Sequence, residues 1–332
     1  MKMDIKPAHE GGALILGGSG FIGQHLVKRL AVRGDRIVIA DIRPPRRKLP
    51  PGVEYVKCDV RLPIVDIPLS SPELIVNLAA VHRTPGHPDR EYYETNCLGA
   101  RNVVAYAANE GVPTIWFTSS ISVYGSTESK ASEADIPRPE SAYGRSKREA
   151  ERIHCAWQKG DPARRLLTVR PAAIFGPGEG GNFTRLGQLL KKGLFVYPGR
   201  RDTVKSCGYV EDLIDALFFM EALNDGSTLF NFCYPERLTI DAIAVLMAHL
   251  GGYRPPLGSL PLTGIVFAAR ALELAERKVG PKMGFHPERV MKLVRSTNIL
   301  PEVLMNSGFS FSGGLVDGLT RWFGEKPRGE FC

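Results

Sequence analysis

The most constraining feature of the sequence is a glycine-rich stretch between two apolar runs near its start. The apolar run 13–16 is followed by Gly-Gly-Ser-Gly-Phe-Ile-Gly at 17–23. A helical pattern comes next, Gly34 would end that helix, and a second apolar run at 37–40 leads into Asp41. This order predicts a strand, a tight turn, a helix and a second parallel strand. It is a βαβ unit of the kind that binds dinucleotides.

Three glycines in this unit have separate tasks. Gly17 permits the tight turn, Gly20 lets a pyrophosphate approach the backbone because it has no Cβ, and Gly23 lets the helix pack closely. The helix N-terminus would present free N–H groups and its positive dipole end to the phosphates. A glycine-rich turn between two core elements is the alternative. The flanking strands, the helix and the terminal Asp41 favour the dinucleotide site.

The residue at the end of the second strand bears on which dinucleotide binds. Asp41 stands where a carboxylate accepts hydrogen bonds from the ribose hydroxyls of adenosine, and its charge would repel a 2′-phosphate. We therefore expect NAD. The neighbouring cations Arg43, Arg46 and Arg47 leave NADP as the alternative.

Strands and helices alternate regularly through the first half of the chain. Apolar runs at 53–57, 74–80 and 114–118 predict three more strands, and a helical pattern spans 88–111. This alternation predicts an α/β fold, a Rossmann-like doubly wound parallel sheet with helices on both faces. The run 74–80 is apolar on both faces, as a central parallel strand is. Its last residues are small, which leaves room for a cofactor at the carboxyl ends of the strands.

A chain of 332 residues is long enough for more than this sheet. We expect an NAD-binding lobe over residues 11–176 and a smaller C-terminal α/β lobe over 177–330, with substrate bound between them. The sequence contains no low-complexity linker, so the two lobes should interlock. The smaller lobe is predicted to contain a strand at 228–233 and helices at 213–223, 239–250 and 315–323.

A serine-rich strand end and a Tyr-x-x-x-Lys helix start carry the predicted chemistry. Ser120 follows the strand 114–118, while Tyr143 and Lys147 are four residues apart and share one helix face. A free Tyr has a pKa of about 10 and is a poor base at pH 7. We expect Lys147, together with the positive nicotinamide ring, to lower the pKa of Tyr143. Ser120 would hold the substrate hydroxyl.

A lone Tyr-x-x-x-Lys is more often an amphipathic surface pair. In this chain the serine-rich strand end and the upstream dinucleotide site favour the catalytic interpretation.

Motifs distributed over residues 13–177 share the pattern of one enzyme family. They are Gly17-Gly18-Ser19-Gly20-Phe21-Ile22-Gly23, Leu78-Ala79-Ala80, Tyr92-Tyr93-Glu94-Thr95-Asn96, Ser119-Ser120-Ile121-Ser122-Val123-Tyr124-Gly125, Tyr143-Gly144-Arg145-Ser146-Lys147, Arg170-Pro171 and Phe175-Gly176-Pro177. The chain thereby resembles the extended short-chain dehydrogenases/reductases of the NAD-dependent epimerase/dehydratase family. The resemblance implies NAD as cofactor and a homodimer formed through two helices. It also implies that Ser120, Tyr143 and Lys147 are the catalytic trio.

The resemblance also implies a set of cofactor contacts. By position they fall on Gly17, Gly20, Phe21, Ile22, Gly23, Asp41, Asp59, Val60, Leu78, Ala79, Ala80, Asn96, Tyr143, Lys147 and Pro171. Taken by itself, Asp59 could equally cap a turn, and Asn96 could either bind backbone or face solvent.

The carboxyl-terminal part resembles the family less closely. By position, Asn182, Lys205 and Arg289 correspond to substrate-binding residues, with Arg295 as the alternative to Arg289. Lys205 stands where the family has an Arg that meets the substrate diphosphate, and it keeps the charge without the two-pronged donor geometry. Ala173 occupies a position at which sugar-nucleotide members often carry Asn.

The resemblance implies an NAD-dependent nucleotide-sugar epimerase, as used in polysaccharide biosynthesis, that removes a hydride and returns it. Ser120 is followed by Ile121-Ser122 rather than by an acidic pair, which disfavours a dehydratase. One alternative is a net NAD(P)-dependent ketone or sugar reductase or dehydrogenase, similar to dihydroflavonol reductases or hydroxysteroid dehydrogenases. Another is a silent dinucleotide-binding protein, which the intact Ser-Tyr-Lys set disfavours.

Composition limits the partners. The net charge of +8 and the pI of about 9.2 suit a phosphate-bearing small molecule. No long basic run interleaved with aromatics occurs, so nucleic acid is not an expected partner. The six cysteines show neither C-x-x-C pairs nor zinc spacing, so we expect free thiols, no metal site and a cytoplasmic location.

No apolar run reaches the ~18–20 residues that span a bilayer. The nearest segment, 262–274, carries Arg270 and Glu273 and predicts an amphipathic helix rather than an integral membrane segment.

Overall fold

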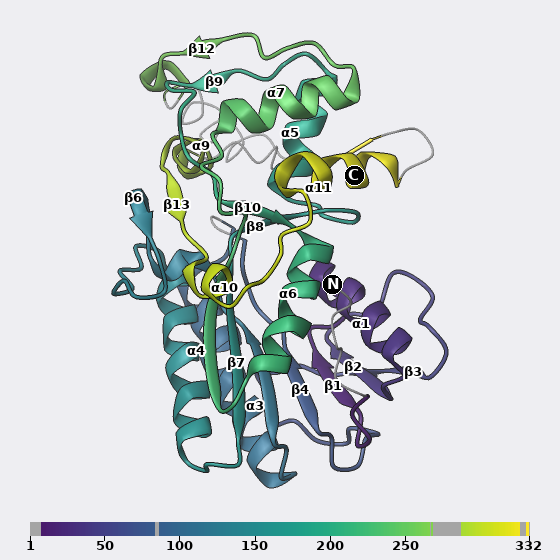
Figure 1. Ribbon diagram of the computed structural model, residues 1–332. Helices are drawn as coiled ribbons and strands as arrows, with labels where there is room; N and C mark the ends of the chain where they lie inside the picture. The colour runs from purple at the N-terminus through teal and green to yellow at the C-terminus, as the bar shows by residue number, and fades with distance from the viewer. Residues whose placement is uncertain (1–7, 84–85, 266, 268–286, 326–329, 332) are drawn as a thin grey trace, which may run out of the picture.

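A seven-stranded parallel sheet forms the centre of the larger lobe, which lies below the smaller lobe in Figure 1. The computed structural model describes residues 8–83, 86–265, 267, 287–325 and 330–331. In sheet order the strands are β11 (Ser227–Phe232), β7 (Arg165–Pro171), β5 (Thr114–Thr118), β4 (Leu74–Asn77), β1 (Ala13–Leu16), β2 (Ile37–Asp41) and β3 (Val53–Lys57). The predicted α/β fold with a doubly wound parallel sheet is confirmed.

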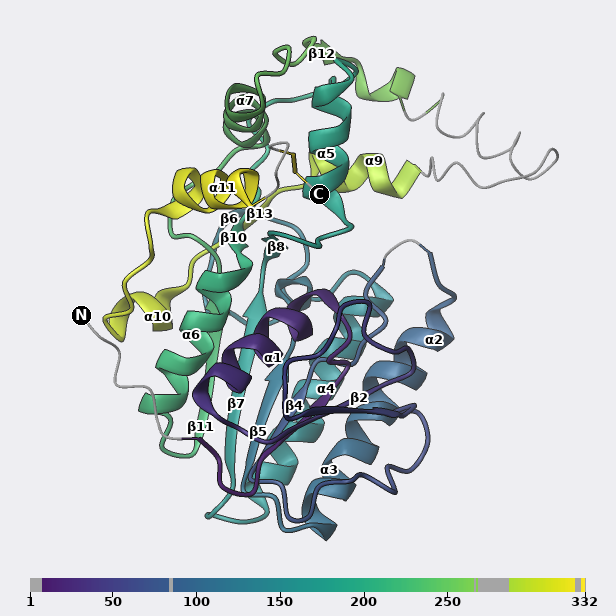
Figure 2. The ribbon, with the colours of Figure 1, turned by 90° about the vertical axis from the view of Figure 1, so that its right-hand side faces the viewer.

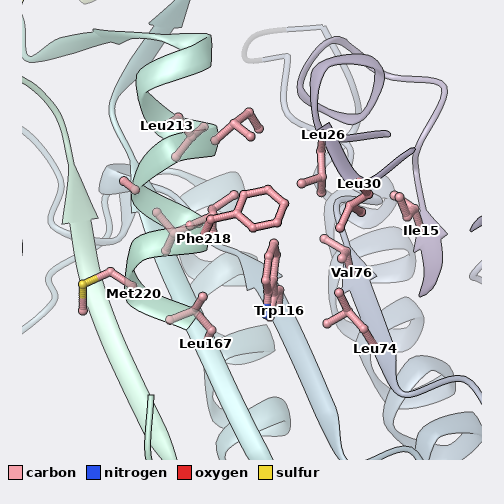
Figure 3. Packing of buried hydrophobic residues seen from close by; sticks show 14 of the residues in the cluster. Ile15, Leu26, Leu30, Leu74, Val76, Trp116, Leu167, Leu213, Phe218 and Met220 are labelled. Carbon is pink, nitrogen blue, oxygen red and sulfur yellow. The ribbon is translucent and has the colours of Figure 1, made fainter. Parts of the chain in front are cut away.

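Helices cover both faces of this sheet (Figure 2). One face packs against α1 (Phe21–Arg33) and α6 (Val210–Leu223), and the other against α3 (Gly99–Asn109) and α4 (Ala142–Lys159). Because successive side chains of a strand point to opposite faces, all strands except β11 contribute to two separate apolar clusters, and β11 contributes to the first alone. Figure 3 shows the first cluster, in which Trp116 of β5 meets Phe218 of α6 edge to face at 5.5 Å.

The order of the strands reverses beside β1, because β2 pairs on one side of β1 and β4 on the other. A crevice at such a reversal is where ligands bind in open parallel sheets. The strand predicted at 74–80 is shorter than expected and ends at Asn77. After Asn77 the glycine turn packs against the loop that follows β4, since a Cβ on Gly17 would lie only 2.7 Å from the amide nitrogen of Ala79.

The helix predicted at 88–111 is interrupted by one wide turn. It comprises α2 (Asp89–Tyr93), a π-helical turn η1 (Glu94–Leu98) and α3. Turns of this kind often mark functional positions. In this turn Asn96 is directed into the protein rather than to solvent.

The strand predicted at 228–233 was wrongly assigned to the smaller lobe. It is β11, and it pairs in parallel with β7 at the edge of the main sheet. The apolar helix α6 precedes it and supplies the crossover that a parallel neighbour requires. The chain therefore returns to the larger lobe after residue 177.

The smaller lobe packs helices around an aromatic core. Its elements are β8 (Ala173–Phe175), α5 (Asn182–Lys191), β9 (Tyr197–Pro198), β10 (Cys207–Tyr209), α7 (Ile240–Gly251), β12 (Ser259–Leu260), α9 (Pro287–Val294), β13 (Thr297–Ile299) and α11 (Gly314–Gly324), whereas α10 (Glu302–Asn306) packs against β11 of the larger lobe. The helices predicted at 239–250 and 315–323 are confirmed as α7 and α11. Phe175, Tyr209 and Trp322 are fully buried in this core.

One short strand connects the active-site region to the smaller lobe. β6 (Thr127–Ala131) follows the short 3₁₀ helix η2 (Ile121–Val123) and pairs in parallel with β13. The sequence predicted only a polar loop here, because the strand TESKA has no apolar alternation of its own.

Among the described residues, no helix is both long and apolar enough to cross a membrane. Most of the amphipathic segment predicted at 262–274 lies outside the described residues.

Candidate active site

The glycine turn has the backbone geometry that its glycines were predicted to allow. Gly17 has φ of +77°, a left-handed conformation that favours glycine. Gly20 is the extended N-cap of α1 and has no side chain that could occupy the position in front of the helix. A Cβ on Gly23 would overlap the carbonyl oxygen of Gly18, so glycine allows the close approach of helix and turn. The first turn of α1 contains no acidic residue, which leaves its N-terminus suited to a phosphate.

Two further observations fit a dinucleotide at this turn. Asp41 accepts hydrogen bonds from the backbone N–H groups of Ser19 and Arg43, both at 3.1 Å, which holds its carboxylate beside the turn. The Ser19 hydroxyl is buried without a hydrogen-bond partner among the described atoms. A buried hydroxyl without a partner is unfavourable in the protein alone, and a bound phosphate would satisfy it.

Other predicted cofactor residues line the same edge. Leu78, Ala79 and Ala80 are half-buried in the loop after β4, and Pro171 ends β7. Phe21 and Ile22 occupy the first turn of α1, where they pack against different apolar clusters. These positions surround the carboxyl ends of the strands.

Asp59 and Val60 follow β3. The carboxylate of Asp59 accepts two-pronged hydrogen bonds from Arg61, which lower its pKa. Val60 is buried and packs close to Gly99 in α3, where any larger residue would overlap it.

Asn96 connects the loop after β4 to the helix α4. Its side-chain oxygen accepts from the Val81 N–H at 3.0 Å, and its amide donates to the Val81 carbonyl at 3.1 Å. The same amide donates to the Ser146 hydroxyl at 2.9 Å, and that hydroxyl donates to the carbonyl of Tyr143. Of the two alternatives for Asn96, the structure shows backbone binding. Ser146, to which the sequence motifs assign no role, thus connects Asn96 to the backbone of Tyr143.

Ser120, Tyr143 and Lys147 come together from two elements. Ser120 is the N-cap of η2, where its hydroxyl oxygen accepts from the Ser122 N–H at 3.1 Å. Tyr143 and Lys147 lie in the first turns of α4. A Cβ on Gly144 would overlap the carbonyl oxygen of Ser122, so this glycine allows α4 to approach η2 closely. Ser120 hydrogen-bonds the Tyr143 side chain.

The expected lowering of the Tyr143 pKa is not found in the chain alone. Burial raises the pKa of Tyr143 to about 12, the hydrogen bond with Ser120 opposes that increase, and nearby Tyr92 adds to it. Lys147 does not contribute to the shift. The physical reason is that desolvation disfavours the phenolate strongly in this half-buried position. Within the original expectation, only the positive nicotinamide ring is left to lower this pKa.

Lys147 is almost completely buried, with 2% of its surface exposed. Burial lowers its pKa to about 8, while Glu151 and Cys97 act in the opposite direction. Its ammonium lies 4.7 Å from the ring centroid of Phe117. The pKa of this lysine is therefore close to physiological pH, so a small change in its surroundings changes the fraction that is charged.

A buried polar network beneath the trio was not predicted from the sequence. Glu151 and Arg170 form a two-pronged pair at 2.8 and 2.7 Å, and Ser119 donates to Glu151 at 2.5 Å. Arg170 also donates to the Tyr124 hydroxyl, which donates to Asn231. The available signal was that Glu151 lies one helical turn beyond Lys147 on the same face.

The three predicted substrate residues differ in what the structure shows. Asn182 is exposed at the start of α5. The Lys205 ammonium donates to the backbone carbonyls of Lys292 and Arg295 at the end of α9, so it stabilises a helix terminus instead of facing a diphosphate. The Arg289 side chain lies outside the described part of the chain.

Among the described residues, no cluster of histidine, cysteine and carboxylate side chains could hold a metal ion.

The model of the NAD dependent epimerase/dehydratase family matches residues 13–232. The chain belongs to this family. NAD is thus its cofactor, in agreement with the glycine turn, the position of Asp41 and the unsatisfied hydroxyl of Ser19.

Known proteins of two kinds are similar to this family member. An Escherichia coli O157:H7 protein named N-acetyl-alpha-D-glucosaminyl-diphospho-ditrans,octacis-undecaprenol 4-epimerase is 28% identical, over 93% of each chain. The human short-chain dehydrogenase/reductase family 42E member 1 is 26% identical over 86% of this chain and 79% of its own length. The solved structure of MoeE5 with UDP-glucose and NAD aligns with a TM-score of 0.72 and 26% identity, covering 94% of this chain and 97% of that one.

Proposed function

We propose that this enzyme is a 4-epimerase that acts on a hexose carried on a diphosphate. The observation that carries the proposal is the convergence of Ser120, Tyr143 and Lys147 at the strand edge where the glycine turn lies. When bound there, NAD supplies a reversible hydride acceptor. Hydride removal and return at one carbon need one acid–base group and no further catalytic residue.

The side chains have complementary roles. Tyr143 takes the proton from the sugar hydroxyl and returns it, Ser120 holds that oxygen, and Lys147, one helical turn from Tyr143, supplies positive charge to the site once NAD is bound. Because burial keeps the Tyr143 hydroxyl protonated in the chain alone, the base forms only when positive charge gathers beside it. Asn96 and Ser146 keep the first turn of α4 in place.

The residues of η2 favour an epimerase over a dehydratase. Elimination needs an additional acid–base pair close to the sugar. The residue after Ser120 is the buried Ile121, followed by Ser122, so η2 supplies no carboxylate.

The sugars named with two similar proteins carry different groups on the far side of the diphosphate, a nucleoside in one and a polyprenyl chain in the other. MoeE5 was solved with a nucleotide sugar, whereas the Escherichia coli relative is named for a polyprenyl-linked sugar. The shared chemistry is a hexose joined to a diphosphate, and we propose a nucleotide sugar first, as in the solved structure. Lys205 is occupied at the end of α9, so recognition of the diphosphate falls to other residues.

The experiment incubates the full chain and NAD with UDP-glucose, UDP-N-acetylglucosamine or polyprenyl-diphosphate N-acetylglucosamine. Nuclear magnetic resonance of the sugars, after acid hydrolysis of the bond to the diphosphate, reports the configuration at C4. We expect the C4 epimer with no accumulation of absorbance at about 340 nm, because the cofactor is recycled. Stoichiometric absorbance growth would instead show a net dehydrogenase and overturn the proposal. Turnover of the polyprenyl substrate alone would overturn the nucleotide carrier.

A homodimer and a cytoplasmic location accompany this proposal as predictions from the sequence. Light scattering on the purified chain measures the first, and fractionation of the source cells measures the second.

A further inference from the structure

The ring of Phe117 contacts two basic side chains of α4. Phe117 lies in β5, three residues before Ser120. The ammonium of Lys147 is 4.7 Å from the ring centroid. The imidazole of His154 stacks on the same ring with centroids 4.1 Å apart and an interplanar angle of 14°. All three side chains are at most 2% exposed, so these contacts are free of solvent screening.

The hydrogen bonds of His154 define its protonation state. Nδ1 lies 2.8 Å from the carbonyl oxygen of Ala150, and because a carbonyl only accepts, Nδ1 carries the proton. Nε2 therefore has a lone pair that accepts from the Asn77 amide at 3.3 Å. Burial lowers the pKa of His154 to about 4, and Lys147 acts in the same direction. The imidazole is thus neutral, and both of its nitrogens are engaged.

These contacts connect three elements at the site. Asn77 ends β4 immediately before the cofactor loop, Phe117 belongs to β5, and His154 lies on the same face of α4 as Tyr143 and Lys147. No predicted motif includes His154. A leucine would fill this apolar position equally well. The two hydrogen bonds that fix the imidazole therefore call for an explanation.

Resting on the proposed function, we propose that His154 is a positioning residue whose anchored imidazole holds the Phe117 ring against the ammonium of Lys147. A ring face attracts a cation and not a neutral amine, so the contact favours the charged form of the lysine. Without the imidazole stacked on it, the Phe117 ring can rotate away, and the ammonium loses a favourable contact in a buried position.

Other charges also face Lys147. Glu151 on α4 and Cys97 in η1 favour its protonated form. His82, in the loop after β4, and His154 interact with the lysine as like charges when protonated. Tyr143 lies one turn away on α4. Variants of Phe117 change none of these groups, and His154 is neutral because burial lowers its pKa to about 4, so a shift in the titration of Lys147 reports on the ring.

The experiment measures the pKa of Lys147 directly, in the full chain saturated with NAD and labelled with ¹³Cε-lysine. Loss of one resonance in Lys147→Arg assigns the signal. We expect Phe117→Leu to lower the pKa by about one unit. His154→Leu should lower it by about half as much, because both the stacked imidazole and its two anchoring hydrogen bonds are lost.

Trp157→Phe is the matched control, because Trp157 is buried on α4 in the same apolar cluster but has no ring contact with Phe117 among the described pairs. A Lys147 pKa in His154→Leu equal to that of the control would overturn the proposal. So would an unchanged value in Phe117→Leu. If His154→Leu does not fold, His154→Gln replaces it, since it retains an acceptor for Asn77 without a ring, and the same lowering is expected.

The titration needs no sugar substrate. A chain without epimerase activity that still shows these shifts would contradict the proposed function and leave the role of His154 at Lys147 intact. Where turnover is measurable, the alkaline limb of kcat should move with the Lys147 pKa, while KM for the sugar stays constant.

Discussion

Glu151 and Arg170 form a two-pronged ion pair between the helix α4 and the strand β7, with hydrogen bonds of 2.8 and 2.7 Å. Glu151 belongs to α4, one turn beyond Lys147, and Arg170 to β7, beside Pro171. Their side chains are 11% and 6% exposed. The pair therefore joins the helix that carries Tyr143 to the carboxyl end of β7, where Pro171 lies.

Arg170→Met should destabilise the chain by about 3–5 kcal/mol, because it leaves the Glu151 carboxylate buried without its partner. Urea denaturation measures the loss. The matched control is Arg152→Met, which removes an exposed pair with Glu149 and should change stability by less than about 1 kcal/mol. Equal losses in the two variants would contradict the structural role assigned to Glu151 and Arg170.

Tyr143→Phe should abolish turnover and retain NAD binding, because it removes the proton acceptor and little else. Kinetics and NAD titration by calorimetry measure the two properties. Tyr106→Phe, a change of the same kind on the neighbouring helix α3, should retain activity. Turnover by Tyr143→Phe above about one hundredth of the wild-type rate would show that another group acts as the base.

Gly17→Ala should weaken NAD binding by at least about tenfold. Its φ of +77° disfavours a side chain, and the new Cβ would lie 2.7 Å from the Ala79 nitrogen and so displace the cofactor loop. Gly34→Ala is the control, since Gly34 has φ of +98° but no neighbour within 4 Å of its Cβ position. Both variants should lose about 1–2 kcal/mol of stability. Only Gly17→Ala should lose NAD affinity. An equal loss of NAD affinity in Gly34→Ala would show that reduced stability, and not the glycine turn, weakens binding.

Lys147→Met should increase stability at pH 7 while it abolishes turnover. Burial lowers the pKa of Lys147 to about 8, below the value of about 10.4 in an unfolded chain. Between these two values the unfolded chain binds more protons, so the stability of the wild type rises with pH. The advantage of Lys147→Met should therefore be full below pH 8 and shrink as the pH rises towards 10. Denaturant titrations at pH 7, 8.5 and 10 test this, and a constant difference would show that Lys147 is not the group that titrates.

The sequence determined the parts of this protein that are local along the chain. The turn from Gly17 to Gly23 with Asp41 after it, and the single helical turn between Tyr143 and Lys147, follow from φ requirements and helix periodicity. They sufficed for the fold class and the cofactor. Tertiary structure decided what depends on contacts between distant residues.

Those distant contacts account for the differences from the sequence-based expectations. β11 pairs with β7 in the main sheet, and the paired residues Leu167 and Thr228 are 61 positions apart in the sequence. No local pattern distinguishes this pairing from the other pairings that an apolar strand could make. The ammonium of Lys205 found helix carbonyls about 90 residues away. Burial, which no local pattern measures, raised the pKa of Tyr143 and lowered that of Lys147, because desolvation depends on everything that surrounds a charge.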